Sequence, residues 1–283
     1  TFLEPTKPFM YTLIAYLYAF LIFAQLLLTF CKISVRELMP SPWHGWLLLI
    51  QAVSSLVLAA LLLWLPMREE YRDVFEGAMV CLICPTATAA AVITGKLGGS
   101  ASSLTTYTLL SNLLAAIVVP LVFPLVEPHA EITFFAAFLK ILGKAFIAVI
   151  PVFLALFLRR FIPPIHRFLA GLRDMAFYLW AVALAIVTGA DREILVNSEA
   201  EIYVEILMLL GGLITCIAQF YLGKRIGKKY NDRISAGQAL GQKNRVSYLD
   251  VLHPYLNPLS SVGPGSYVLW QNILTVISCG KRE

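Results

Sequence analysis

Apolar runs of about twenty residues follow one another along most of this chain, and charged residues are sparse within them. A helix of that length crosses the hydrocarbon core of a bilayer, and the runs lack the alternation of a half-buried strand. The composition agrees, because 59% of the 283 residues are hydrophobic, only 14% are charged, and the mean hydropathy is +0.78. Since backbone groups in hydrocarbon must be paired within the protein, the sequence predicts an all-α membrane protein.

The lengths of the runs predict nine transmembrane helices within one integral-membrane domain. They lie at about 8–31, 43–66, 73–94, 102–126, 133–161, 174–188, 202–223, 233–254 and 259–278. The third and the eighth contain residues that a regular lipid-facing helix does not accommodate. We therefore expect both of these helices to be interrupted.

The distribution of basic residues predicts the orientation, because short cytoplasmic loops retain Lys and Arg. Alternate loops are basic, and they contain Lys32, Arg36, Lys96, Arg159, Arg160, Arg167, Arg173, Lys224, Arg225, Lys228, Lys229, Arg233, Lys281 and Arg282. The opposite loops are sparse or acidic. We expect the N-terminus outside and the C-terminus in the cytoplasm. The net charge of +5 is then a topological signal rather than a sign of nucleic-acid binding.

Five cysteines lie within or at the ends of apolar runs, too scattered for a zinc pattern. We interpret them as packing thiols. The spans show no metal-ligand spacing and no nucleophile beside a base, so we do not expect an enzyme or a resident cofactor.

The first expected interruption is at Cys84-Pro85-Thr86-Ala87-Thr88. A proline in mid-span removes a helical hydrogen bond and clashes with the preceding turn. In membranes, unwound backbone is tolerated where it is buried in protein or lines a watery cavity. The alternative is a simple proline kink.

The second expected interruption lies at 235–245, where two glycines, two glutamines, an asparagine and two cations share one run. A charge at the centre of a span costs roughly 2.5–3.5 kcal/mol on insertion scales, so Lys243 and Arg245 require a wet or paired environment. The alternative is a cytoplasmic loop, which leaves eight helices.

Two interrupted segments at corresponding places in the two halves of a membrane protein indicate inverted repeats around a binding site near the midplane. A repeat of five plus five helices places the interruptions in the fourth and ninth of ten. The third and eighth of nine fit that scheme if one N-terminal helix is missing from the chain.

Three stretches together resemble the bile acid:sodium symporter family and its bacterial members. They are Cys84-Pro85 with Thr88, then Gly241-Gln242-Lys243-Asn244, and Trp270-Gln271-Asn272. The resemblance implies a bacterial inner membrane and an inverted-repeat fold with two broken crossing helices. It also implies core helices at about 43–126 and 202–278 and panel helices at about 8–31 and 133–188.

The positions that bind sodium in the family are altered here. By the resemblance, a Ser-Asn pair becomes Ala90-Ala91, and a glutamate becomes Gln238, whereas its glutamine partner remains as Gln242. Thr108 or Ser103 supplies a hydroxyl in that scheme, and Gln51 is a loose candidate for a second site. A hard cation is left without a carboxylate ligand, so we expect poor sodium binding.

Proton coupling is a second possibility for the driving force. Asp250 and His253 lie three residues apart, on one face of a continuing helix, and histidine titrates near neutral pH. The alternative is that both are solvated at the extracellular mouth, where the span ends.

Cations beside broken helices favour an anionic substrate. We expect transport of bile-acid-like or small carboxylates, with Thr86, Thr88, Gln242, Lys243 and Asn244 contacting the substrate. Two alternatives stay open: Lys243 neutralises a helix C-terminus, and the chain is a channel or a membrane sensor. The sequence does not indicate an oligomeric state or a partner other than the solute and membrane lipid.

Overall fold

A computed structural model describes residues 7–33, 37–87, 89–126, 133–172, 174–196, 201–244 and 262–280. These residues are almost entirely helical, and apart from one isolated bridge they contain no β-structure. The helices are α1 (Lys7–Phe30), α2 (Pro42–Trp64), α3 (Glu69–Ile83), α4 (Ala90–Lys96), α5 (Ala101–Val126), α6 (Phe134–Phe161), α7 (Pro163–Gly171), α8 (Met175–Val196), α9 (Ile202–Lys228), α10 (Arg233–Gly241) and α12 (Val262–Gly280). The prediction of an all-α protein is confirmed.

Three of the described helices, α2, α5 and α9, are long and apolar enough to cross a membrane. Large apolar side chains lie exposed along these helices, for example Leu56 on α2, Leu121 on α5 and Ile214 on α9. Such a surface requires a lipid solvent, and it identifies a membrane protein. The count of nine spans stays a prediction.

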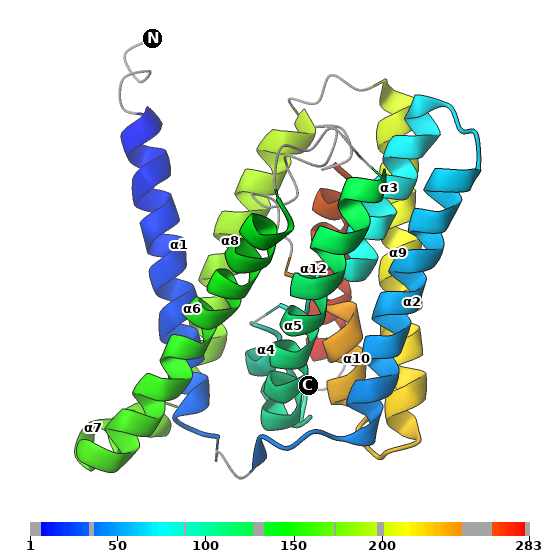
Figure 1. The fold of residues 1–283 in the computed structure, drawn as a ribbon. Coiled ribbons are helices and arrows are strands. Elements are labelled where there is room, and N and C mark those ends of the chain that lie inside the picture. The colour runs from blue at the N-terminus through cyan, green and yellow to red at the C-terminus, as the bar shows by residue number, and fades with distance from the viewer. Residues whose placement is uncertain are drawn as a thin grey trace.

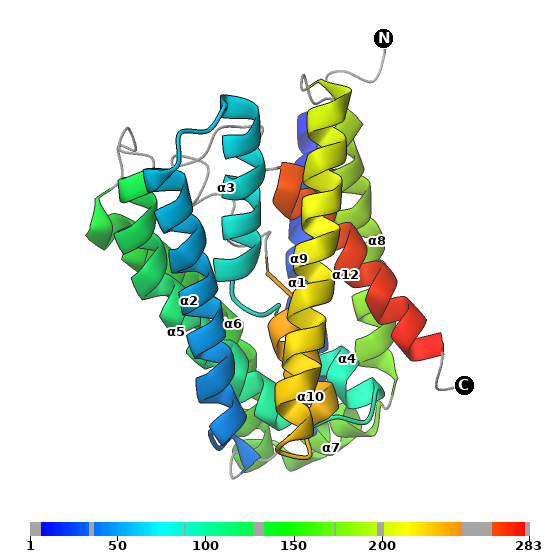
Figure 2. The ribbon, with the colours of Figure 1, turned by 90° about the vertical axis from the view of Figure 1, so that its right-hand side faces the viewer.

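The described helices form one connected bundle, in which α6 packs against both α1 and α5. α1 lies against α6 and α8, whereas α9 lies against α10, α12 and α3, and α2 lies against α3 and α5 (Figures 1 and 2). The turn between α4 and α5, the turn between α9 and α10, and α7 all lie at the lower end of Figure 1. Lys96, Arg167 and Lys229 lie in or beside these segments, so we call this end of the bundle the basic end.

α7 was not predicted. It begins with Pro163 and Pro164, which are favourable at the first helical positions because the N–H that proline lacks has no helical partner there. None of its side chains is buried, and it connects α6 to α8 along the surface. Its nine residues are too few to cross a bilayer, which is why a search for long apolar runs passes over it.

Small residues bring α9 and α10 into close contact. A Cβ atom at Gly223 of α9 would collide with the carbonyl oxygen of Ala236 and would lie 3.0 Å from the Cα of Gly237, both on α10. Backbones approach this closely only where side chains are absent. This contact places α10 within the helix bundle, where all of the residues 235–241 are buried. Residues 235–241 are therefore part of a packed helix and not of a loop.

Candidate functional site

The two interrupted segments meet inside the protein. α3 ends at Ile83 and α10 ends at Gly241, and Figure 2 shows the two helices with these ends turned toward each other. Thr86 and Lys243 form an isolated antiparallel bridge. The N–H of Ala87 donates to the carbonyl of Gln242 at 3.0 Å, and the N–H of Asn244 donates to the carbonyl of Pro85 at 2.8 Å. Each unwound segment therefore supplies backbone partners for the other.

Side chains from three elements satisfy the last carbonyls of α3. Pro85 has no N–H for the carbonyl of Cys81, and Nε2 of Gln219 donates to that oxygen at 3.2 Å. The carbonyl of Ile83 accepts from Nε2 of Gln51 at 2.8 Å. The carbonyl of Leu82, between these two, accepts from Nζ of Lys243 at 3.2 Å. The segment is thus a full interruption with new partners, rather than a simple kink.

The end of α10 is capped in a similar way. The hydroxyl of Thr86 donates to the carbonyl of Ala239 at 2.6 Å, and the hydroxyl of Tyr267 donates to the carbonyl of Gly241 at 2.7 Å. Thr86 is completely buried, so neither water nor lipid competes for its hydroxyl. The broken ends are held by buried hydrogen bonds on both sides.

α5 and α12 place matching acceptors against the two bridge residues. The N–H of Thr86 donates to Oγ of Ser111 on α5 at 3.1 Å. On the other side, the N–H of Lys243 donates to Oε1 of Gln271 on α12 at 2.7 Å, and Nε2 of Gln271 returns a bond of 3.2 Å to the Lys243 carbonyl. The Gln271 side chain thus pairs with the backbone N–H and carbonyl of Lys243, as the backbone of a neighbouring β-strand does.

Each acceptor follows a buried tyrosine by one helical turn. Tyr107 precedes Ser111 on α5 and donates its hydroxyl to Oε1 of Gln51 at 3.1 Å. Tyr267 precedes Gln271 on α12 and accepts from Nε2 of Gln219 at 3.1 Å. The two halves of the chain therefore present the same pairing of a glutamine and a tyrosine beside each break.

Lys243 is buried, and its ammonium lies at the C-terminal turn of α3. That end of a helix carries a partial negative charge, so a cation there is stabilised. The sequence left two roles open for Lys243, a substrate contact and the neutralisation of a helix C-terminus, and this hydrogen bond corresponds to the second. Lys243 also lines the cavity described below, and its ammonium has a partner within the protein.

Gln238 and Gln242, two of the predicted ion ligands, lie side by side. Nε2 of Gln242 donates to Oε1 of Gln238 at 2.8 Å and lies 2.9 Å from Oγ1 of Thr275 on α12. All three residues are buried. An amide nitrogen thus lies between two oxygens that would otherwise be available to a cation.

The other predicted ion ligands are engaged elsewhere. Gln51 caps α3, Oγ of Ser103 lies 3.1 Å from Nε2 of His44, and the hydroxyl of Thr108 donates to the carbonyl of Leu104 in its own helix at 3.0 Å. Ala90 and Ala91 are buried at the start of α4, in an apolar cluster with Trp43 and Tyr107. Thr88, Arg245, Asp250 and His253 lie outside the described residues.

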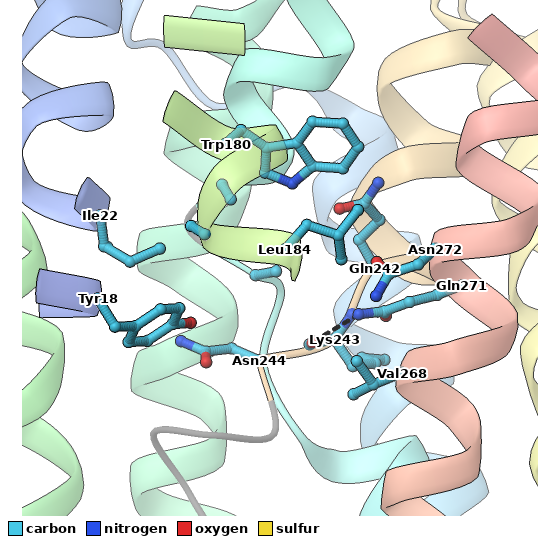
Figure 3. A pocket seen from close by; sticks show the side chains of 13 residues that line it. Tyr18, Ile22, Trp180, Leu184, Gln242, Lys243, Asn244, Val268, Gln271 and Asn272 are labelled. Atoms are coloured by element: carbon cyan, nitrogen blue, oxygen red, sulfur yellow. Dashed lines mark hydrogen bonds between the residues drawn. The ribbon is translucent and has the colours of Figure 1, made fainter. Parts of the chain in front are cut away.

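A cavity of about 80 Å³ lies beside the crossing, and we call it the midspan cavity (Figure 3). Its walls come from α1, α8, α12 and both breaks, and its lining residues are Tyr18, Ile22, Ala87, Ala89, Trp180, Ala183, Leu184, Gln242, Lys243, Asn244, Val268, Gln271 and Asn272. In Figure 3 the ring of Tyr18 points toward Asn244 across it. Nδ2 of Asn272 is buried and has no hydrogen-bond partner in the described part of the chain.

Two larger cavities lie toward the basic end. The Lys96 cavity, about 440 Å³, is lined by residues of α1, α4, α5 and α8, including Lys32 and the ion pair of Lys96 with Asp174 at 2.9 Å. Burial lowers the pKa of Lys32 below its ordinary value, and Asp174 opposes that shift. The Lys228 cavity, about 530 Å³, is lined by three cations, Lys224, Lys228 and Arg233, against one carboxylate, Asp232, and it extends to Gln238.

Several residues of this arrangement were not predicted as site residues: Tyr107, Ser111, Gln219, Tyr267 and Thr275. The sequence signal that could have identified them is a polar side chain inside an apolar run. On α5 and α12 this signal is a pair of polar residues one helical turn apart, Tyr107 with Ser111 and Tyr267 with Gln271.

No protein-family model matches this chain, and a search of characterised proteins finds no match either.

Proposed function

We propose that this chain is a secondary transporter of small organic anions that works by alternating access in a bacterial inner membrane. The observation that carries the proposal is the meeting of two broken helices beside a cavity that α1 and α8 border. Discontinuous helices of this kind hold substrates near the midplane of transporters, because unwound backbone and helix ends offer polar groups away from water.

The matched surroundings of the two breaks support an inverted repeat, with α2–α5 in one half and α9–α12 in the other. Tyr107 with Ser111 corresponds to Tyr267 with Gln271, and each second residue accepts the N–H of a bridge residue. With the packing of α1 against α6 and α8, this arrangement favours a core and a panel, as in the bile acid:sodium symporter family. The basic end is then cytoplasmic, and the N-terminus is outside.

The lining of the midspan cavity favours an anion. Four of its lining residues have amide side chains, and the buried Nδ2 of Asn272 is a donor without a protein partner among the described residues. A carboxylate accepts hydrogen bonds only, so it fits a wall that offers donors. The cations of the Lys228 cavity attract anions to the basic end of the bundle.

The size of the midspan cavity favours a small solute. Pockets for drug-sized ligands have volumes of roughly 300–1,000 Å³, and this cavity has about 80 Å³. Of the two substrate classes expected from the sequence, small carboxylates fit this conformation better than bile-acid-like steroids.

Sodium coupling is not part of the proposal. The amide of Gln242 lies between Oε1 of Gln238 and Oγ1 of Thr275, and the ammonium of Lys243 neutralises the end of α3. We infer that the Gln242 amide and the Lys243 ammonium occupy the positions that a coupling cation would need. We expect transport without sodium. Proton coupling through Asp250 and His253 stays a prediction, and uptake unaffected by Asp250→Asn with His253→Gln would exclude it.

Flux through proteoliposomes tests the proposal. Uptake of a panel of radiolabelled mono- and dicarboxylates is measured with a sodium gradient, a proton gradient or neither. We expect saturable uptake of at least one small carboxylate, undiminished when choline replaces sodium. Absence of uptake across the panel would reject the transporter and favour a sensor.

A further inference from the structure

Gln25 on α1 is completely buried, and neither polar atom of its side chain has a partner within the described residues. An amide left unpaired in a buried site costs about 1–3 kcal/mol for each unsatisfied group. Leu21 and Leu26 beside it are buried apolar residues, so an amide here contributes nothing to packing that leucine would not. A buried amide of this kind finds its partner in a bound water, in a ligand or in another conformation of the protein.

Gln25 lies between two cavities along one face of α1. Tyr18 and Ile22 line the midspan cavity, whereas Thr29 and Lys32 line the Lys96 cavity. Residues three and four positions apart share a helix face. Gln25 is three positions after Ile22 and four before Thr29, so it occupies the centre of the stripe that borders both cavities.

α4 and α8 border the same two cavities in the same order. On α8, Trp180 lines the midspan cavity and Phe177 the Lys96 cavity. Ala89, the residue before α4, lines the first cavity, and Val92 on α4 lines the second. Val92 and Trp180 pack with Leu28 of α1 in one apolar cluster. This cluster forms an apolar constriction between the cavities, and Gln25 is the polar group on the α1 face of that constriction.

We propose that the solute passes between the midspan cavity and the Lys96 cavity along this face of α1, and that the Gln25 amide contacts it on the way. Nε2 of Gln25 donates to a carboxylate oxygen of the passing anion. The inference rests on the proposed transport function and adds a route and a contact residue to it. In the present conformation the apolar cluster closes the route, which leaves the amide without its partner.

Gln25→Leu tests the contact. Leucine has a similar volume and no polar atom, so we expect an unchanged or higher Tm in detergent and a carboxylate uptake rate at least tenfold lower. Ser55→Ala is the matched control, because Ser55 is also buried and unpartnered among the described residues but lies on α2 and lines neither cavity. The control should transport like the parent protein. Unchanged uptake by Gln25→Leu, or a loss of uptake accompanied by a lower Tm, would overturn the inference.

Thiol labelling tests the route without relying on transport. In a variant with the five native cysteines replaced, Gln25→Cys should react with a membrane-impermeant thiol reagent added at the basic end, and acetate should slow the reaction. Leu26→Cys, in the cluster that faces α6, should not react. Labelling of Gln25→Cys without anion flux by the parent protein would reject the proposed function and retain the route. Flux by the parent protein with no labelling of Gln25→Cys would reject the route alone.

Discussion

Thr86 lies opposite Lys243 in an antiparallel bridge, and the two residues belong to the ends of different broken helices, far apart in the sequence. The bridge connects α3 to α10 through backbone hydrogen bonds, so neither segment is unwound on its own. Such mutual satisfaction is the condition under which irregular backbone persists at membrane depth. Any motion that separates the two breaks must replace these bonds with others.

Thr86→Val should destabilise the protein. Valine keeps the shape of threonine but removes the hydroxyl that donates to the carbonyl of Ala239, and a buried carbonyl without a donor costs about 1–3 kcal/mol. Thermal unfolding in detergent should show a lower Tm for Thr86→Val. Thr86→Ser retains the donor and should unfold close to the parent protein. Equal Tm values for Thr86→Val and the parent would show that this hydrogen bond does not hold the crossing together.

Gly223→Ala should separate α9 from α10. The added Cβ meets the backbone of Ala236 and Gly237, which cannot move aside as the end of a flexible side chain could. We expect a lower Tm and loss of uptake. Gly143→Ala is the control, because nothing lies within 4 Å of a Cβ at that position of α6. Alanine in place of glycine within a helix stabilises by about 0.5–1 kcal/mol, so the control should unfold at the same or a higher temperature.

Asn272→Leu should weaken substrate binding with little effect on folding. Leucine has a similar shape but offers no donor in place of the buried Nδ2, which has no partner among the described residues. A hydrogen bond to a charged group contributes about 1.5–3 kcal/mol, which corresponds to a rise in KM of roughly 10- to 150-fold. Uptake kinetics and Tm of the same preparation check this. A raised KM for anions with an unchanged Tm supports the assignment, and an unchanged KM contradicts it.

Gln238→Glu should create a response to sodium that the parent protein lacks. A carboxylate at position 238 shares the Gln242 amide with Oγ1 of Thr275, and it offers a hard cation a charged oxygen ligand in a buried position. A ligand at ten times its Kd stabilises the folded state by about 1.4 kcal/mol. We expect sodium chloride, but not choline chloride, to raise the Tm of Gln238→Glu and to leave the parent unchanged. A sodium-dependent Tm in the parent protein would refute the role given to the Gln242 amide.

The two interruptions could be predicted from the sequence because their causes are local. Pro85 removes one N–H from the helical ladder, and the polar run around Gln242 does not fit hydrocarbon. The partners of the freed groups could not be predicted, because they come from helices distant in the sequence. Gln219 and Tyr267, for example, become informative only when α9 and α12 are seen to pack against α3.

The residues of the site also differ in whether the sequence alone could assign their role. Gln242 and Asn244 line the midspan cavity, as expected from their place in the second break. Lys243 was consistent with either a substrate contact or a helix cap, since a long flexible side chain reaches in several directions, and only the position of α3 shows where its ammonium lies. Gln25 gave only the weak signal of a polar residue within an apolar run, because its meaning depends on the cavities before and after it along α1.

Counterflow tests the central claim most directly, because only a carrier that binds its solute on alternating sides exchanges one molecule for another. Proteoliposomes are loaded with an unlabelled small carboxylate that the protein takes up, and entry of the labelled compound is followed with no ion gradient. We predict transient accumulation of label above its external concentration, and its loss in Thr86→Val. Entry that only equilibrates and rises linearly with concentration would indicate a channel and contradict the account.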